Sequence, residues 1–320
     1  MADMPVSDVS RRIRLLLEGA VQRNLTDCIL LSGGLDTSIV TAVASKYSKL
    51  TGITVSLGDA PDVKFAKLIV EKYGLKHHIV RVGRNDIERA IFEVVQVIQS
   101  FDPMEIRNDA TIMIGLENAR ELGFNGVMTG DAGDELFAGY SFFFKMRPDE
   151  LEKKLRKMWD TMRFSSVPLA KSLGMKAKLP LLDHEFKNFA MEIPVQLKIH
   201  KERGRVYGKW ILRKSFEQDL PDEILWRVKM PIEQGSGTSS LSEYYGTKIS
   251  DSEFNLKREQ LSKSDRVRIR DKEQLAYYEI YRRIFGTPDG RGSGSKICTG
   301  CSTQLPEEMN YCRTCGEYPV

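Results

Sequence analysis

The sequence lacks any apolar run long enough to cross a membrane. A transmembrane helix needs about 18 or more apolar residues in succession, and no such run occurs among the 320 residues. The N-terminus, Met1-Ala2-Asp3-Met4-Pro5, also lacks the basic region and apolar core of a secretory signal. We therefore expect a cytoplasmic protein with no membrane partner.

Cysteine and histidine are scarce over most of the chain. Of five cysteines only Cys28 lies before position 298, which argues against a disulfide framework. Cys28 sits in the apolar run 28–31 and is expected to be a small buried hydrophobe. The four histidines, at positions 77, 78, 184 and 200, show no metal-ligand spacing. We expect them to be packing or surface residues and assign none of them to catalysis.

The excess of positive charge is small. A net charge of +4 does not by itself indicate a nucleic-acid partner. The basic residues are nevertheless concentrated in residues 198–214, where seven lysines and arginines accompany a single glutamate. This stretch favours two structures equally: a solvated helical face, or a wall that faces the phosphates of a nucleotide, pyrophosphate or RNA.

The most informative stretch is Ser32-Gly33-Gly34-Leu35-Asp36-Thr37-Ser38, which lies between an apolar strand at 28–31 and a helical pattern from Ile39. Glycine permits a tight turn and a close approach of backbone N–H groups to an anion. The helix N-terminus behind it favours phosphate, and Asp36 offers a carboxylate to a hard cation. The simpler alternative is an ordinary strand–turn–helix junction.

This string resembles the PP-loop of the ATP pyrophosphatases, which cleave ATP to AMP and pyrophosphate. It does not match a Walker A loop, because no Gly-Lys-Ser/Thr follows, nor the Gly-x-Gly-x-x-Gly fingerprint of dinucleotide binding. The resemblance implies that the loop cradles the phosphates of ATP.

Strands and helices alternate over the first part of the chain. Strands are predicted over 28–31, 53–57, 78–82 and 127–129, and helices over 8–24, 62–73, 86–99 and 109–122. The alternation indicates an α/β fold with a parallel sheet whose carboxyl edge holds the ligand. From Tyr140 to about Gly286 we predict helices and no strand.

We therefore divide the chain into five segments. They are an N-terminal helix (1–24), a PP-loop ATP-binding core (25–145), a helical half (146–285), a flexible Gly- and Ser-rich linker (286–296) and a zinc-ribbon-like tail (297–320).

A second polar stretch follows the strand at 127–129. Residues 130–135 read Gly-Asp-Ala-Gly-Asp-Glu and bring three carboxylates together. Such groups repel one another unless a cation or hydrogen bonds hold them, and a magnesium ion shared with triphosphate oxygens would do so. An acidic helix N-cap is the alternative.

This second stretch resembles the acidic signature of asparagine synthetases. Further segments match that family in the same order: residues 55–57, 60–64, 179–183, 209–216 and 220–229. The resemblance covers about residues 10–245. It implies a HUP-like (adenine nucleotide alpha hydrolase-like) domain with a helical C-terminal half.

The resemblance also implies roles for individual residues. Those that would contact ATP are Leu31, Ser32, Gly33, Gly34, Asp36, Thr37, Ser38, Val55 and Gly130; those that would bind Mg²⁺ are Asp36 and Asp134; those that would be catalytic are Lys229, Lys209 and Asp131. Lys229 would stabilise the charged intermediate and pyrophosphate, and Asp131 would stand in the position of a general base. A substrate carboxylate would attack the α-phosphate, and ammonia or an amine would then displace AMP from the acyl-adenylate.

Three features depart from the family pattern. Asparagine synthetases usually begin with a glutaminase domain, whereas this chain begins Met1-Ala2. We therefore expect ammonia from solution or from a separate glutaminase subunit, or another amine; a carrier protein is a further candidate partner. The family's Ser-Gly-Glu is Thr129-Gly130-Asp131 here, and its shorter side chain shifts the carboxylate by about 1 Å. The third departure is the cysteine-rich tail.

The tail contains two Cys-x-x-Cys pairs, Cys298 with Cys301 and Cys312 with Cys315. Four thiolates at this spacing suit a tetrahedral structural zinc, and two redox disulfides are the alternative. Because the tail is not strongly basic, we expect it to contact a partner protein at least as readily as RNA.

Three functions follow from these patterns. The leading one is an ATP-dependent amide-forming ligase that uses ATP, Mg²⁺, structural Zn²⁺ and a small carboxylate substrate. The alternative is a PP-loop tRNA-modifying enzyme that adenylates a nucleobase, with the tail on RNA or a partner protein; sulfur transfer is disfavoured because only Cys28 lies near the loop. Asp36, Asp134 and Lys229 argue against the third function, a non-catalytic binding module.

Overall fold

The computed structural model describes residues 4–320, which form two compact units. Unit 1 comprises the chain up to Ser56, Ala60–Arg81 and Gly115–Pro231, and unit 2 comprises Leu57–Asp59, Val82–Ile114 and Ile232–Val320. The chain thus passes between the units several times. No helix among the described residues is long and apolar enough to cross a membrane.

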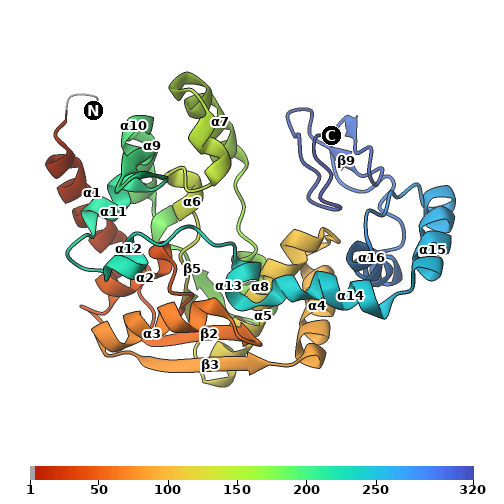
Figure 1. The fold of residues 1–320 in the computed structure, drawn as a ribbon, viewed down its shortest axis with the longest axis horizontal. Coiled ribbons are helices and arrows are strands. Elements are labelled where there is room, and N and C mark those ends of the chain that lie inside the picture. The colour runs from red at the N-terminus through yellow and green to blue at the C-terminus, as the bar shows by residue number, and fades with distance from the viewer. Residues whose placement is uncertain (1–3) are drawn as a thin grey trace. The chain divides into compact units, whose positions relative to one another are not determined.

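Unit 1 contains the central sheet and most of the helices (Figure 1). Its strands are β1 (Cys28–Leu30), β2 (Thr51–Leu57), β3 (Lys76–Val82), β4 (Gly126–Met128) and β5 (Lys176–Lys178), with a hairpin of β6 (His200–Glu202) and β7 (Arg205–Tyr207). Its helices are α1 (Val6–Arg23), α2 (Leu35–Ala44), α3 (Pro61–Tyr73), the C-terminal part of α5 (Pro103–Glu121), α6 (Gly133–Leu136), α7 (Pro148–Thr161), α8 (Ser166–Ser172), α9 (His184–Glu192), α10 (Val195–Lys198), α11 (Trp210–Ser215) and α12 (Asp222–Leu225). Short 3-10 turns cover Ser141–Lys145 and Pro180–Leu182.

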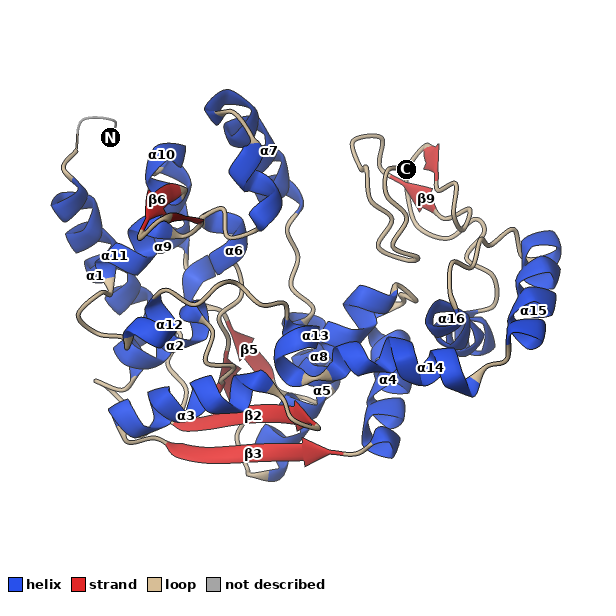
Figure 2. Cartoon of the chain, viewed as in Figure 1, coloured by secondary structure: helices blue, strands red, loops and turns tan. Residues whose placement is uncertain are grey.

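The five-stranded sheet has the order β3-β2-β1-β4-β5. β1 pairs in parallel with β2 and β4, and β4 pairs in parallel with β5; Figure 2 shows β2 and β3 side by side, pointing the same way. The predicted α/β class with a parallel sheet is confirmed. The strand order reverses between β1 and β4, where ligands of such sheets bind beyond the carboxyl ends of the strands.

The prediction that no strand lies between Tyr140 and Gly286 was wrong. β5 completes the parallel sheet, and β6 and β7 form an antiparallel hairpin. All three are only three residues long, and β5 reads Lys-Ala-Lys. Such a sequence lacks the apolar, β-branched run by which a strand is recognised, and its pairing with β4 comes from tertiary contact.

The two faces of β1 pack against different helices. Ile29 and Leu31 belong to one hydrophobic cluster with apolar residues of α1, α2, α3, α9 and α11. Leu30 points the other way, toward Gly115 of α5, where an added Cβ would lie 2.8 Å from its side chain. This glycine lets α5 approach the sheet closely, so helices cover both faces and leave the strand ends free for a site.

Unit 2 contains the remaining helices and the cysteine-rich tail. Its elements are α4 (Arg84–Ile98), the N-terminal part of α5, α13 (Ile232–Ser236), a 3-10 turn (Thr238–Ser240), α14 (Leu241–Lys248), α15 (Asp251–Ser264), α16 (Lys272–Phe285), β8 (Lys296–Ile297) and β9 (Gln304–Leu305). Phe101 packs edge-on against Tyr278 and Tyr281 of α16. The Phe101 N–H also donates to the carbonyl of Thr314 at 2.7 Å, so the tail packs into the core of this unit.

Candidate active site

The predicted phosphate loop is the link between β1 and α2. Gly33 has φ +64°, and a Cβ there would lie 2.4 Å from the backbone of Phe65 and Ala66 in α3. Glycine is therefore required by both the dihedral angle and the packing. The first helical bond runs from the Ser38 N–H to the Gly34 carbonyl at 3.0 Å. The helical N–H groups before it lack intrahelical acceptors, a geometry that suits an anion.

The hydroxyl groups of the loop hold its shape. The Ser32 Oγ accepts from the Gly34 N–H at 3.2 Å and lies 3.3 Å from the Thr37 Oγ1, which donates to the Gly34 carbonyl at 3.2 Å. Ser38 is fully buried, and its Oγ has no hydrogen-bond partner among residues 4–320. Ser32 and Thr37 are thus preorganised at the turn, while the Ser38 hydroxyl retains an unused donor.

The acidic stretch after β4 packs directly on this loop. Ile29 of β1 is paired with Met128 of β4, so the two strand ends are adjacent. A Cβ on Gly130 would lie 2.8 Å from the Thr37 backbone nitrogen, and one on Gly133 would lie 2.3–2.6 Å from atoms of the Asp36 carboxyl. These two glycines let the two polar stretches interlock.

Two carboxylates and two lysines meet where the stretches interlock. The Lys209 Nζ lies 2.5 Å from the Asp36 Oδ2 and 2.9 Å from the Asp134 Oδ1. The Lys229 Nζ lies 3.6 Å from the Asp134 Oδ2. The structure therefore brings together four residues selected from the sequence, and the ammonium group of Lys209 joins the two carboxylates that were expected to share a cation.

The charges of this cluster depend on one another. Burial alone would raise the pKa of the Asp134 carboxyl, but Lys209 and Lys229 outweigh it and hold that pKa below its ordinary value. Burial raises the pKa of the Asp36 carboxyl against the attraction of Lys209. The Asp36 Oδ1 is buried without a hydrogen-bond partner. Hard carboxylate oxygens, one of them unsatisfied, fit a Mg²⁺ ion.

The backbone around Lys209 is tightly constrained. Lys209 has φ +57°, which costs a non-glycine residue about 1–3 kcal/mol. A Cβ on Gly139 would lie 2.0 Å from the Asp134 Oδ1 and 2.3 Å from the Lys209 Cε. The Lys209 N–H donates to the Phe137 carbonyl at 2.8 Å. These contacts fix the lysine between the carboxylates and are typical of a preorganised site.

We expect Gly133→Ala to lower the free energy of unfolding by about 1–3 kcal/mol, because its methyl group would overlap the Asp36 carboxyl. The matched control is Gly19→Ala in α1, where a Cβ would meet only the flexible Arg23 side chain. That control is expected to stabilise by up to about 1 kcal/mol. Urea unfolding measures both; equal effects would contradict the close packing described for Gly133.

Asp131 lies in a different environment from Asp36 and Asp134. Its Oδ2 accepts hydrogen bonds from the Thr129 Oγ1 at 2.9 Å and from the Ser166 Oγ at 2.5 Å. Burial raises the pKa of the Asp131 carboxyl against these two bonds. The other oxygen, Oδ1, accepts no hydrogen bond from residues 4–320. Ser166, on α8, was not selected from the sequence because only the tertiary fold brings it to Asp131.

Glu135 is a titratable group that the sequence reasoning did not single out. Its Oε1 accepts from the Tyr140 hydroxyl at 2.5 Å. Burial, followed by the nearby charge of Asp134, raises the pKa of Glu135 to about 7. The Lys229 Nζ lies 5.3 Å from the centre of the Tyr140 ring. The position of Glu135 within the acidic stretch was the signal that could have identified it.

Leu31 and Val55 contribute little free surface. Leu31 is 1% exposed and Val55 is 7% exposed. The Leu31 N–H donates to the Ile53 carbonyl, and its own carbonyl accepts from the Thr54 hydroxyl. Their predicted contact with the nucleoside remains a prediction. Cys28 is buried, as expected, and burial raises the pKa of its thiol to about 12.

A family model for asparagine synthase matches residues 12–171 and 168–297. The chain belongs to the asparagine synthase family. Asparagine synthetase [glutamine-hydrolyzing] 1 of Lotus japonicus is 33% identical over 249 residues, which are 69% of this chain and 42% of that protein. The asparagine synthetase of Zea mays is 29% identical over 309 residues, 87% of this chain and 52% of that protein. The chain thus spans about half the length of these relatives.

Solved structures share only a distant likeness. The NH3-dependent NAD synthetase of Campylobacter jejuni has a TM-score of 0.31 at 13% identity and covers 74% of this chain and 96% of its own. The NMN synthetase of Francisella tularensis has a TM-score of 0.31 at 15% identity, over 59% and 94% of the two chains. Such scores support no argument about function. The five-stranded parallel sheet agrees with the predicted α/β class, and the HUP-like assignment stays a prediction.

Arg227 is a further residue, besides Ser166 and Glu135, that the sequence reasoning did not single out in this asparagine synthase core. Its guanidinium donates to the Gly33 carbonyl at 3.2 Å, pairs with the Asp62 Oδ1 at 2.8 Å and lies 3.8 Å from the Phe65 ring centre. Arg227 therefore ties the segment that carries Lys229 to the phosphate loop and to α3. Its place two residues before Lys229 was the available signal.

The basic stretch 198–214 is neither of the two structures expected. It runs through α10, β6, β7 and α11 and is not one helical face. Lys198 is fully buried and donates to the carbonyls of Leu136 and Ala190 at 2.9 and 2.7 Å. Arg213 is also buried, and its guanidinium donates to the carbonyls of Gly208 and Leu225. Of the seven basic residues only Lys209 reaches the acidic cluster by an ion pair. Lys198 and Arg213 satisfy backbone carbonyls, and Arg203 and Lys214 pair with Asp222 and Glu217.

Burial of Lys198 predicts a pH dependence of stability. Burial lowers the pKa of Lys198 from 10.5 to about 7. Between these values the unfolded chain binds more protons, so the free energy of unfolding rises with pH. Between pH about 7 and about 10, we expect the free energy of unfolding of wild type to rise by about 1 kcal/mol per pH unit relative to that of Lys198→Met. The exposed Lys201→Met serves as control in urea titrations. A gap between wild type and Lys198→Met that stays constant over this range would contradict the prediction.

The four tail cysteines gather at one point, as the zinc prediction requires. Their sulfur atoms all lie within 4.8 Å of one another. Two contacts join the two knuckles: Cys298 with Cys315 at 3.6 Å and Cys301 with Cys312 at 3.7 Å. A zinc–sulfur length of about 2.3 Å gives tetrahedral edges of about 3.8 Å. The group thus fits a zinc ion, and no disulfide links these four cysteines.

Proposed function

We propose that this chain is an ATP-dependent amide-forming ligase that adenylates a small carboxylate and transfers ammonia or an amine to it. The observation that carries the proposal is the cluster of Asp36, Asp134, Lys209 and Lys229 beside the phosphate loop. It places opposite charges at the point where the strand order reverses, in a chain of the asparagine synthase family.

The phosphate loop and its partners would position ATP. The free N–H groups at the start of α2 and the Ser32 and Thr37 hydroxyls are donors for phosphate oxygens. Asp36 and Asp134 would hold Mg²⁺, which supplies positive charge to the phosphates when bound. The Lys209 ammonium group keeps the two carboxylates together beforehand, at 2.5 and 2.9 Å.

Lys229 is placed to stabilise the charge that develops in adenylation. Its side chain is 30% exposed, and its Nζ is only loosely paired with Asp134, at 3.6 Å. A lysine in this state can turn toward the α-phosphate as the substrate carboxylate oxygen bonds to phosphorus and pyrophosphate leaves with the electron pair of the broken bond. Charge stabilisation of this kind contributes about 3–4 kcal/mol in comparable sites.

Asp131 would take part in the second step. The Thr129 and Ser166 hydroxyls fix its Oδ2, and we propose that Oδ1 receives the proton of the attacking amine. Burial raises the pKa of the Asp131 carboxyl, and a raised pKa makes a carboxylate a stronger proton acceptor. The amine nitrogen then bonds to the acyl carbon and AMP leaves.

Pyrophosphate release tests the proposal over a panel of small carboxylates with ammonium, in the presence and absence of tRNA. We expect release that depends on one class of carboxylate and yields its amide, and that Asp134→Asn abolishes it. Release only with tRNA would contradict the proposal and favour the nucleobase-adenylating alternative. Sulfur transfer receives no support, since Cys28 is buried and its thiol stays protonated.

A further inference from the structure

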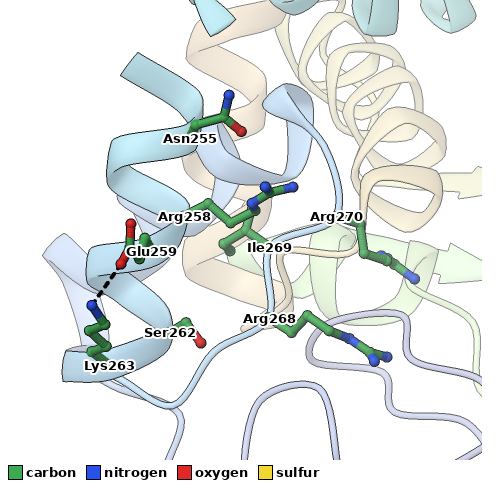
Figure 3. Close-up of a pocket in the computed structure, with 8 residues that line it drawn as sticks. All are labelled: Asn255, Arg258, Glu259, Ser262, Lys263, Arg268, Ile269 and Arg270. Atoms are coloured by element: carbon green, nitrogen blue, oxygen red, sulfur yellow. Dashed lines mark hydrogen bonds and ion pairs between the residues drawn. The ribbon is translucent and has the colours of Figure 1, made fainter. Parts of the chain in front are cut away.

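Unit 2 contains a hollow of about 770 Å³ between α15 and the segment that leads into α16 (Figure 3). Eight residues line it: Asn255, Arg258, Glu259, Ser262, Lys263, Arg268, Ile269 and Arg270. Four of them are cationic and one is anionic, and none is aromatic. The proposed function of unit 1 makes no use of this hollow, and the inference below does not depend on that function.

The cations of the hollow are only partly neutralised. Lys263 pairs with Glu259 at 2.7 Å. Arg268 pairs with Glu317 yet remains 61% exposed, and Arg270 pairs with Asp102 at 3.6 Å and is 37% exposed. Arg258 lies over the Phe254 ring, at 5.2 Å from its centre, and has no carboxylate within ion-pair distance among residues 4–320. The hollow therefore offers arginine donors to an anion from solution.

The segment 266–270 presents its arginines in a row. Val267 and Ile269 are buried, at 1% and 2% exposure, whereas the arginines at 266, 268 and 270 are exposed. Figure 3 shows Arg268 and Arg270 extending together to the side of the segment that faces away from α15, while Arg258 points from α15 toward the segment. Alternate residues of an extended chain lie about 6–7 Å apart. That spacing is comparable to successive phosphates along a single strand and suits a row of charges better than one small anion.

Both cysteine knuckles hold this row in place. The Arg268 N–H donates to the carbonyl of Gly300, within the first knuckle, at 2.8 Å. The Arg270 guanidinium donates to the carbonyls of Cys315 and Gly316, in the second knuckle, at 2.8 Å each. Gln274 adds a bond to the Cys315 carbonyl. A metal that fixes the knuckles therefore also fixes the positions of the arginines.

We propose that the hollow binds the phosphate groups of a nucleic-acid strand, and that the metal-loaded tail holds the arginine row in the binding position. Guanidinium groups match phosphate oxygens with paired hydrogen bonds. Because no aromatic side chain lines the hollow, the bases gain no stacking platform, and contacts to the backbone are sequence-independent. The tail would then serve to position the arginines for nucleic-acid binding, a role separate from the chemistry proposed for unit 1.

The test is fluorescence anisotropy of a labelled oligouridylate with the full-length, zinc-loaded protein. We expect Arg258→Glu to weaken binding about tenfold and to reduce the salt slope. The matched control is Arg283→Glu, which makes the same charge change at an exposed arginine of α16 outside the hollow. Its affinity should stay within about twofold of wild type. Equal losses in the two variants would overturn the proposal, as would no measurable binding by wild type.

A second variant and three competitors complete the test. Arg268→Gln should also weaken binding, by about threefold to tenfold; an unchanged affinity would overturn the proposed row. Displacement by unlabelled strand, with pyrophosphate ineffective, supports a nucleic acid; equal displacement by pyrophosphate supports the phosphate site but assigns it to a small ligand. Displacement by polyglutamate as effective as by unlabelled strand would overturn phosphate recognition in favour of an acidic protein.

Removal of zinc tests the role of the tail. Chelation should weaken oligouridylate binding at least as much as Arg258→Glu does, while the affinity of unit 1 for ATP stays unchanged. Loss of both affinities would show a general collapse and would contradict the specific role given to the knuckles. Full retention of oligouridylate affinity after chelation would contradict it as well.

Discussion

Lys209→Met is expected to lower the free energy of unfolding by about 3–5 kcal/mol in the absence of Mg²⁺. Lys209 is 4% exposed and is the cation shared by Asp36 and Asp134. Its removal leaves two buried carboxylates facing each other, with only the Lys229 ammonium group at 3.6 Å from Asp134. That single, partly exposed lysine does not fully compensate the repulsion and desolvation. Urea unfolding with and without Mg²⁺ measures the effect, and Mg²⁺ should restore part of the loss.

The matched control for Lys209 is Lys214→Met. Lys214 is on the same helix, α11, and pairs with Glu217 at 2.6 Å, but both side chains are partly exposed. Such a pair contributes at most about 1 kcal/mol. Similar losses of unfolding free energy in Lys209→Met and Lys214→Met would show that the buried cluster contributes no more to stability than an exposed ion pair. A loss that Mg²⁺ does not reduce would argue against a metal at Asp36 and Asp134.

Arg227→Met is expected to raise the dissociation constant for ATP by about tenfold to a hundredfold. The guanidinium of Arg227 holds the Gly33 carbonyl and the Asp62 carboxylate, so its loss frees the phosphate loop and the segment that carries Lys229. The change also leaves Asp62 buried without its partner, which costs about 2–4 kcal/mol of stability. Calorimetric ATP titration and urea unfolding measure the two effects separately.

The double variant Arg227→Met with Asp62→Asn separates positioning from stability. Removal of the buried charge should recover most of the lost stability, because no unpaired carboxylate remains. ATP affinity should stay low, because nothing then holds the Gly33 carbonyl. Recovery of both quantities in the double variant would contradict a positioning role for Arg227.

The features that could be predicted from sequence are those written in consecutive residues. The phosphate loop at 32–38 and the acidic stretch at 130–135 each follow a strand, and their positions at neighbouring strand ends follow from a parallel sheet. The spacing of the four cysteines alone predicted that they would lie close together.

The features that escaped prediction depend on contacts between distant residues. Lys209 was selected from the sequence, but its contact with Asp36 spans 173 positions and was not predicted. Arg227 was not selected, and it reaches Gly33 across 194 positions. Nothing in the local sequence distinguishes Lys198, which is buried on two carbonyls, from its exposed neighbour Lys201. The same reason explains β5, whose Lys-Ala-Lys sequence gains its strand conformation from pairing with β4.

The linker and tail illustrate a further limit of sequence patterns. Glycine and serine at 286–296 indicate flexibility, yet the Gln304 N–H donates to the Arg291 carbonyl at 2.7 Å. The Tyr311 hydroxyl bonds the Asp102 carboxylate, and the Ser100 hydroxyl bonds the Arg313 carbonyl. These contacts join the tail to residues about two hundred positions earlier, which composition alone does not reveal.

The most direct test of the account is the identity of the products formed from ATP. Phosphorus NMR of ATP with Mg²⁺, ammonium and the carboxylate selected by the panel should show AMP and pyrophosphate in equal amounts, matched by amide. With the substrate carboxylate labelled by ¹⁸O, one label should appear in AMP, because its oxygen bonds to the α-phosphorus. Formation of ADP and orthophosphate, or AMP without label, would contradict adenylation of a carboxylate at this site.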